Sequence, residues 1–121
     1  MRHNLFRLAK KVSKKSPSIF KLGCVITDRK HKVLSVGFND MNKTHPKSKA
    51  FHKAIHAELD ALLGLSYSDL KDGHAYVYRE LQNGDMALSK PCIHCEEMLK
   101  RAGIKKVYYT DNTGYKSMKL K

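Results

Sequence analysis

The sequence contains no tryptophan, three prolines and three cysteines, and it has 11 acidic residues against 24 basic ones. Three cysteines are too few for a disulfide framework, so a small secreted scaffold is not expected and a reducing compartment is favoured. No apolar run approaches the ~20 residues of a membrane-spanning helix, and no apolar segment follows the basic N-terminus as it does in a secretory signal. These absences predict a cytoplasmic protein with no membrane segment.

The charge is strongly one-sided, with a formal net charge of +13 at pH 7. A balance of this kind favours polyanionic or phosphorylated partners, with nucleic acid among them. A lysine-rich surface that contacts only solvent is the alternative. The sequence has no acidic residue before Asp28, and residues 41–57 hold lysines and histidines without an acidic one. Near an active site, the second stretch could contact a phosphate group.

The length and an apolar fraction of 41% predict one globular domain spanning residues 1–121. Hydrophobic spacing predicts helices over residues 4–14, 56–63 and 91–102, and strands over residues 22–27, 32–38, 74–79 and 104–110. A turn is expected at residues 111–114, and only residues 115–121 follow it. A parallel strand there would need a crossover of about a dozen residues or more, so a fifth strand is predicted to return antiparallel.

Two short motifs carry the chemistry of this chain. His56-Ala57-Glu58 is followed, 36 residues after its histidine, by Cys92 of Pro91-Cys92-Ile93-His94-Cys95. Zinc prefers four ligands of imidazole and thiolate type, and a catalytic zinc leaves one position for water. His56, Cys92 and Cys95 supply three such ligands. Pro91 suits the first position of a helix, and residues three apart on a helix face the same way, so both cysteines can reach one metal.

The glutamate of the first motif suits the role of a base. Two thiolates cancel the charge of Zn²⁺, so such a metal acidifies its water less than one held by neutral imidazoles. Glu58 can take the proton of that water and return it during the reaction. Residues two apart do not share a helix face, so His56 is predicted to lie at the entry of its helix, with Glu58 just inside.

Each motif alone has other interpretations. A Cys-x-x-Cys pair is also typical of structural zinc sites and redox pairs. A structural site would need a fourth protein ligand, for which His94 and Cys24 are the candidates; Cys24, however, lies in a predicted strand, where a cysteine is usually a small buried apolar residue. A non-catalytic, zinc-stabilised binding module therefore stands beside the catalytic interpretation, and Glu58 distinguishes them.

Taken together, the two motifs resemble those of the zinc-dependent cytidine/deoxycytidylate deaminase superfamily, over about residues 22–110. The resemblance implies a three-layer α/β/α fold around a mixed sheet of four to five strands, one catalytic Zn²⁺ per subunit, and a homo-oligomer. It implies hydrolytic conversion of cytosine to uracil with release of ammonia. It further implies that Asn39 contacts the substrate sugar, that the Ala57 amide holds the pyrimidine carbonyl, and that Ser89 lines the pocket through backbone atoms. A turn-forming role is the alternative for Asn39.

The features that separate subfamilies point in different directions. An antiparallel fifth strand is associated with free-nucleoside cytidine deaminases, whereas His-Ala-Glu is the pattern of nucleotide- and polynucleotide-acting relatives. We expect a free cytosine nucleotide or nucleoside as substrate. The alternative is cytosine or adenosine in single-stranded DNA or RNA or in tRNA, which the high positive charge favours.

Overall fold

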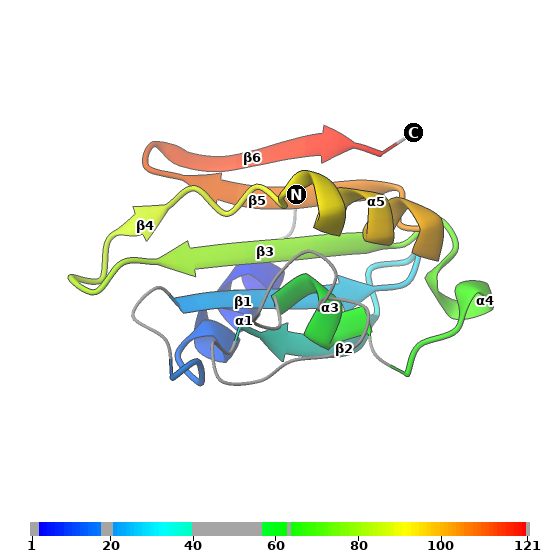
Figure 1. The fold of residues 1–121 in the computed structure, drawn as a ribbon, viewed down its shortest axis with the longest axis horizontal. Helices are drawn as coiled ribbons and strands as arrows, with labels where there is room; N and C mark the ends of the chain where they lie inside the picture. Colours follow the sequence, from blue (N-terminus) through cyan, green and yellow to red (C-terminus); the bar gives the residue numbers. More distant parts are fainter. Residues whose placement is uncertain (1–2, 18–20, 40–56, 63, 121) are drawn as a thin grey trace.

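The computed structural model of the chain describes residues 3–17, 21–39, 57–62 and 64–120. Figure 1 shows one twisted sheet with helices on both faces. The predictions made for His56 and for the basic stretch at residues 41–56 lie outside the described residues.

The sheet is mixed and is built from strands β1 (Lys21–Thr27), β2 (Val33–Phe38), β3 (His74–Glu80), β4 (Met86–Ala87), β5 (Lys106–Asp111) and β6 (Gly114–Lys119). The strand order is β2-β1-β3-β5-β6, and the two-residue β4 pairs with β3. β3 and β5 run parallel, joined by the crossover helix α5 (Ile93–Ala102). The other pairs, β1 with β2, β1 with β3, and β5 with β6, are antiparallel.

Helices cover both faces of this sheet and complete three layers. Helix α1 (His3–Ser13) lies behind the sheet in Figure 1, and α3 (Ala57–Leu62) and α5 lie in front of it. The short helix α4 (Tyr67–Leu70) connects the α3 layer to β3. The α/β/α architecture and the antiparallel return of β6 are confirmed; β4 and α4 were not predicted.

Two separate apolar clusters hold the layers together. On the α1 face, Phe6 and Ala9 pack with Val25, Tyr76 and Tyr108. On the other face, the core is made of small and aliphatic side chains from α3, α5 and the central strands: Cys24, Ile26, Ala57, Ala61, Ala75, Val77, Leu99 and Val107. The division follows the alternation of side chains along each strand. Each helix therefore buries its apolar side against the sheet.

The helix that carries the cysteines begins later than predicted. Cys92 is the N-cap of α5, with an extended backbone at φ −65° and ψ 165°, and its carbonyl oxygen accepts the N–H of Glu96 at 2.8 Å. Pro91 thus precedes the helix, and its prediction as the first helical residue was wrong. The C-terminal end is confirmed: Gly103 has φ 102°, and its N–H bonds the carbonyls of Leu99 and Lys100, as an αL cap does.

None of the helices in the described ranges combines the length and the apolar character needed to cross a membrane.

Candidate metal centre

The first turn of α5 presents two thiols. Cys92 is the N-cap and Cys95 lies three residues later in the helix. Cys95 is fully buried, with 0% of its surface exposed, and Cys92 is half-buried. Both are thiols rather than disulfides. A pair of soft sulfur donors at the N-terminus of a helix is a ligand set that suits zinc.

Helix α3 carries the other motif. Ala57 is its first described residue and is fully buried. Glu58 is the next residue of this helix, although its side chain is outside what the structure describes, and His56 lies outside it altogether. The expectation of a helix that begins close to His56 is consistent with these bounds. Helices α3 and α5 contact each other on the same face of the sheet.

The two motifs lie against the same row of paired residues, which crosses three neighbouring strands of the sheet. Gly37 pairs with Cys24, and Cys24 pairs with Val77, on neighbouring strands. The carbonyl oxygen of Ala57 lies against Gly37. At the other end of the row, the hydroxyl of Ser89, three residues before Cys92, donates to the Val77 carbonyl at 2.7 Å. The start of α3 and the segment before α5 are therefore both anchored to this row.

Two residues that the sequence interpretation missed fix α3 on β2. A Cβ added to Gly37 would lie 2.7 Å from the Ala57 carbonyl oxygen and 2.9 Å from the Cα of Ala61, so only glycine lets the helix approach so closely. The carboxylate of Asp60 accepts the backbone N–H of Phe38 at 3.1 Å. The one sequence signal for this bond was an acidic residue within the apolar pattern of a short helix.

Ser89 is bonded within the protein through both of its donors. Its backbone N–H donates to the Thr110 carbonyl at 2.8 Å. Its hydroxyl bonds the Val77 carbonyl and accepts the Thr110 N–H, each at 2.7 Å. Ser89 is 2% exposed. The network fixes the segment that leads to Cys92 between β3 and β5, and Thr110, also missed from sequence, is its second anchor.

Asn39 continues the pairing of β2 with β1. It is 8% exposed, its side-chain oxygen accepts the Leu22 N–H at 2.9 Å, and its N–H donates to the Leu22 carbonyl at 3.3 Å. Its own carbonyl accepts the Ser16 hydroxyl at 2.8 Å. These bonds give Asn39 a structural role at the strand end, and they hold its side-chain amide in one orientation.

Among the described residues, no three side chains of His, Cys, Asp or Glu gather into a group able to hold a metal ion. Cys92 and Cys95 supply two donors, and the third predicted ligand, His56, is outside those residues. The thiols fit zinc in donor type.

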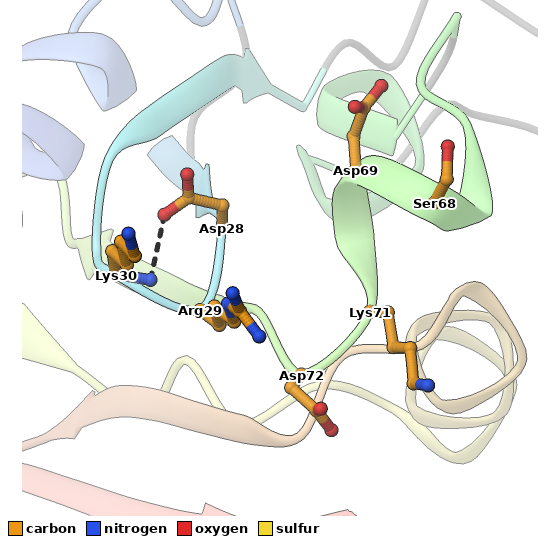
Figure 2. A pocket seen from close by; sticks show the side chains of 7 residues that line it. All are labelled: Asp28, Arg29, Lys30, Ser68, Asp69, Lys71 and Asp72. Atoms are coloured by element: carbon orange, nitrogen blue, oxygen red, sulfur yellow. Dashed lines mark hydrogen bonds between the residues drawn. The ribbon is translucent and has the colours of Figure 1, made fainter.

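A hollow at the opposite end of α5 lies far from the two thiols. It has a volume of about 430 Å³ and lies between the β1–β2 turn and α4 (Figure 2), lined by Asp28, Arg29, Lys30, Ser68, Asp69, Lys71 and Asp72. The N–H of Asp72 bonds the carbonyl of Gly103 at 2.9 Å, which places this hollow at the C-terminal end of α5. A ten-residue helix is about 15 Å long, so Cys92 is remote from it.

Comparison with known proteins identifies the family to which the chain belongs. Residues 1–111 match the family described as the cytidine and deoxycytidylate deaminase zinc-binding region. The chain belongs to this family. Zn²⁺ is accordingly the cofactor of the matched region, as the motifs predicted.

A relative in Caenorhabditis elegans, named a probable deoxycytidylate deaminase, is 30% identical over 125 residues, which cover 92% of this chain. The chain spans 58% of the length of that relative.

The fold is shared with solved deaminase structures. A cytidine deaminase from Burkholderia pseudomallei superimposes with a TM-score of 0.72 at 20% identity, over 99% of this chain and 93% of that chain. The apo dCMP deaminase of cyanophage S-TIM5 gives a TM-score of 0.61 at 22% identity, over 90% of this chain and 81% of that chain. These similarities establish the cytidine-deaminase-like fold.

Proposed function

We propose that this protein catalyses the zinc-dependent hydrolytic deamination of a cytosine nucleotide or nucleoside, within one domain spanning residues 1–121. The observation that carries the proposal is the anchoring of both motifs to one row of the sheet, with Ala57 at one end and Ser89 at the other. Membership of the cytidine and deoxycytidylate deaminase family and the name of the C. elegans relative support the same chemistry.

The proposed metal ligands are His56, Cys92 and Cys95. When bound, Zn²⁺ would supply an activated water for attack on C4 of cytosine. Glu58 transfers one proton of that water to N3 of the ring, and then transfers the remaining hydroxyl proton to the departing amino group. A C4–O bond forms, the C4–N bond breaks, and ammonia leaves, so the products are uracil and ammonia. Cys95 is fully buried, which supports its role as a metal ligand on a side of the site that bulk water does not reach.

Three further residues are proposed to position the base and the sugar. The Ala57 N–H lies at the start of α3, where the first N–H groups of a helix have no partner within the helix, and it suits the pyrimidine carbonyl. Asn39, oriented by its bond to Leu22, is proposed to donate to the sugar. Ser89 uses its N–H and hydroxyl within the described residues, so its carbonyl oxygen is the atom proposed to accept from the amino group.

A homo-oligomer is proposed with its contact beside the cysteines. Ile93 is 71% exposed and Leu88 is 54% exposed, and both are close in sequence to Cys92. Large apolar side chains exposed together are typical of interaction surfaces. A second copy of the chain would cover them next to the proposed site.

The experiment that tests the proposal measures zinc content and turnover of dCMP by two variants. Glu58→Gln is expected to keep zinc and fold while losing activity by ~10²-fold or more, the usual contribution of a proton-transferring side chain. Cys95→Ser is expected to lose zinc and activity together. Full activity of Glu58→Gln would overturn the mechanism. Zinc-loaded wild-type protein that turns over no cytosine compound would instead support the non-catalytic binding module.

A further inference from the structure

The outward side of α1 is a continuous basic surface. Five exposed, positively charged residues belong to α1 and to the turn that follows it: Arg7, Lys10, Lys11, Lys14 and Lys15. The inward side is apolar and buried, with Phe6 at 1% and Ala9 at 0% exposure. The sequence holds no acidic residue before Asp28. The helix therefore presents cations to solvent without acidic neighbours of its own.

Acidic residues elsewhere in the described part of the chain neutralise little of this positive charge. Of the five cations, Lys14, in the turn after α1, is the one for which the described part of the chain records an ion pair, with Glu80 at 3.7 Å. The side chain of Glu80 is 9% exposed, whereas that of Lys14 is 58% exposed. The lysine thus covers the buried carboxylate and remains accessible. The other four cations are exposed, so a polyanion can reach them.

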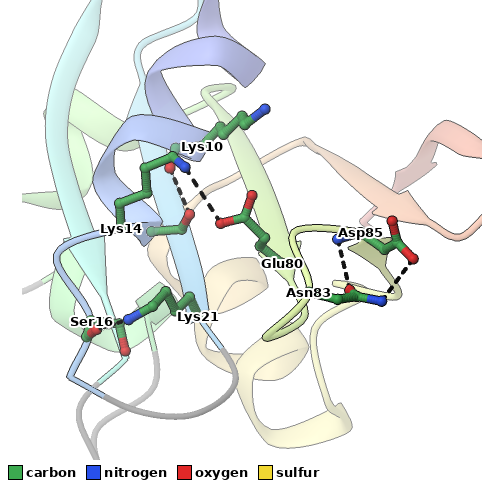
Figure 3. A network of polar contacts seen from close by, with 8 residues as sticks. Lys10, Lys14, Ser16, Lys21, Glu80, Asn83 and Asp85 are labelled. Carbon is green, nitrogen blue, oxygen red and sulfur yellow. Dashed lines mark hydrogen bonds and ion pairs between the residues drawn. The ribbon is translucent and has the colours of Figure 1, made fainter.

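A cleft extends this surface beyond the last turn of α1. It has a volume of about 460 Å³ and is lined by Lys14, Pro17, Lys21, Glu80, Leu81, Gln82, Asn83 and Gly84. In Figure 3, Lys21 points toward Ser16, whose carbonyl oxygen it bonds. The turn between β3 and β4 closes the other side and is held by bonds between Asn83 and Asp85. The cleft places Lys14 and Lys21 beside the buried Glu80 at the end of α1, where a ligand that lies along the helix would meet them.

The position of this surface separates it from the proposed active site. Helix α1 and helix α5 lie on opposite faces of the sheet (Figure 1), so the sheet itself separates the two surfaces. Capture of a substrate phosphate near Cys92 therefore does not account for the charge on α1.

The spacing and the burial favour one class of partner. Arg7 and Lys14 are seven residues apart, about 10 Å at the helical rise of about 1.5 Å per residue. Three phosphates of one strand span the same distance when its bases are stacked as in B-DNA, at about 3.4 Å each. An anionic membrane is disfavoured because the apolar side of α1 is buried in the core and has nothing to insert. We propose that α1 and the adjoining cleft bind the phosphate backbone of a single-stranded nucleic acid, independently of base sequence and apart from the deamination site.

Binding of a fluorescent 20-nucleotide oligothymidylate, measured by anisotropy across a salt series, tests this proposal. The test variant carries Arg7→Gln, Lys10→Gln and Lys11→Gln, which preserves helix propensity and leaves Lys14 on Glu80. The matched control carries Lys100→Gln, Arg101→Gln and Lys105→Gln, three exposed cations at the C-terminal end of α5. Both variants lose three charges. Circular dichroism and the unfolding midpoint verify that each is folded.

The proposal predicts that the α1 variant binds about tenfold or more weakly near physiological salt. It also predicts a log–log salt slope smaller by about 2, since each single-strand phosphate contact contributes about 0.7. The α5 variant should bind as the wild type does. Equal weakening of both variants would show a general effect of net charge and overturn the proposal. Equal affinity for polyglutamate of the same charge would assign the surface to acidic protein instead and would also overturn it.

Discussion

Gly37 of β2 lies directly beneath α3, so close that a Cβ added to it would be 2.7 Å from the carbonyl oxygen of Ala57. The same atom would also meet the backbone of Ala61. Backbone atoms cannot move aside as a flexible side chain can, so the helix that carries Glu58 is seated by this glycine. The position of α3 relative to the sheet thus depends on the absence of a single methyl group.

Gly37→Ala is expected to push α3 away from the sheet. The added methyl should lower the free energy of unfolding by about 1–3 kcal/mol, the usual cost of overpacking, and reduce zinc bound per folded molecule. Urea unfolding and metal analysis measure the two effects. Gly23→Ala is the matched control, because its Cβ would meet the backbone of α1 at Ser13, 2.6 Å away, on the opposite face. Equal loss of zinc in both variants would contradict the specific role of Gly37.

Ser89→Ala is expected to lower the free energy of unfolding by about 2–3 kcal/mol, because it leaves buried partners on Val77 and Thr110 without a hydrogen bond. The segment before Cys92 should also lose its fixed position, which predicts a lower kcat with less change in KM. Thermal unfolding and steady-state kinetics test these effects. Ser117→Ala, at an exposed position of β6, is the control and should change neither. A Ser89→Ala protein as stable as the wild type would refute the network.

A stacked histidine pair predicts how stability depends on pH. The rings of His31 and His74 are 3.9 Å apart and 13° from parallel. Burial, and then the charges of His31, Lys106 and Lys105, lower the pKa of His74 from 6.5 to about 4. Between pH 6.5 and about pH 4, His74 therefore binds a proton in the unfolded chain but not in the folded protein. The stabilisation is complete above pH 6.5 and is lost as the pH falls toward 4.

His74→Phe should flatten this dependence, since the ring can still stack but cannot titrate. Screening reduces the full effect of the shift, so we expect the wild type to lose about 1–2 kcal/mol more than the variant between pH 7 and pH 4. Urea titrations at several pH values provide the comparison. Parallel stability profiles for the two proteins would show that His74 is not the responsible group.

Ile93→Lys is expected to weaken the proposed contact between subunits, because a charge replaces an exposed apolar side chain beside Cys92. Light scattering should give a smaller mass for this variant than for the wild type at the same concentration. Tyr67→Lys is the control, since Tyr67 is 59% exposed but lies in α4. A wild-type protein that is already a monomer would contradict the proposed oligomer.

The sequence predicted the course of the main chain well where short-range rules determine it. Gly103 ends α5 because an αL residue is needed there, and the short turn between Asp111 and Gly114 returns β6 antiparallel to β5. Pro91 was predicted to be the first helical residue, but α5 begins two residues later, at Ile93, because Cys92 takes the extended conformation of an N-cap. The preference of proline for the first helical position could not show which residue is the N-cap of α5.

Contacts between distant segments were the part that the sequence could not provide. Ser89 was predicted to line a pocket, but its bonds to Val77 and Thr110 depend on how β3 and β5 are placed. The bond from Phe38 to Asp60 and the fit of α3 on Gly37 likewise join residues about 20 positions apart. The roles of His56 and Glu58 remain predictions from the motif.

The measurement that tests the central claim most directly is mass-spectrometric detection of deaminated product. Zinc-loaded wild-type protein is incubated with cytidine, CMP, dCMP, single-stranded oligonucleotides and tRNA, with Glu58→Gln alongside. The account predicts uracil products from the free nucleotides or nucleosides, formed about 100-fold or more slowly by the variant. Product from the polymers alone would contradict the substrate assignment and make polynucleotide deamination the function. No product from any substrate would contradict the deaminase assignment itself.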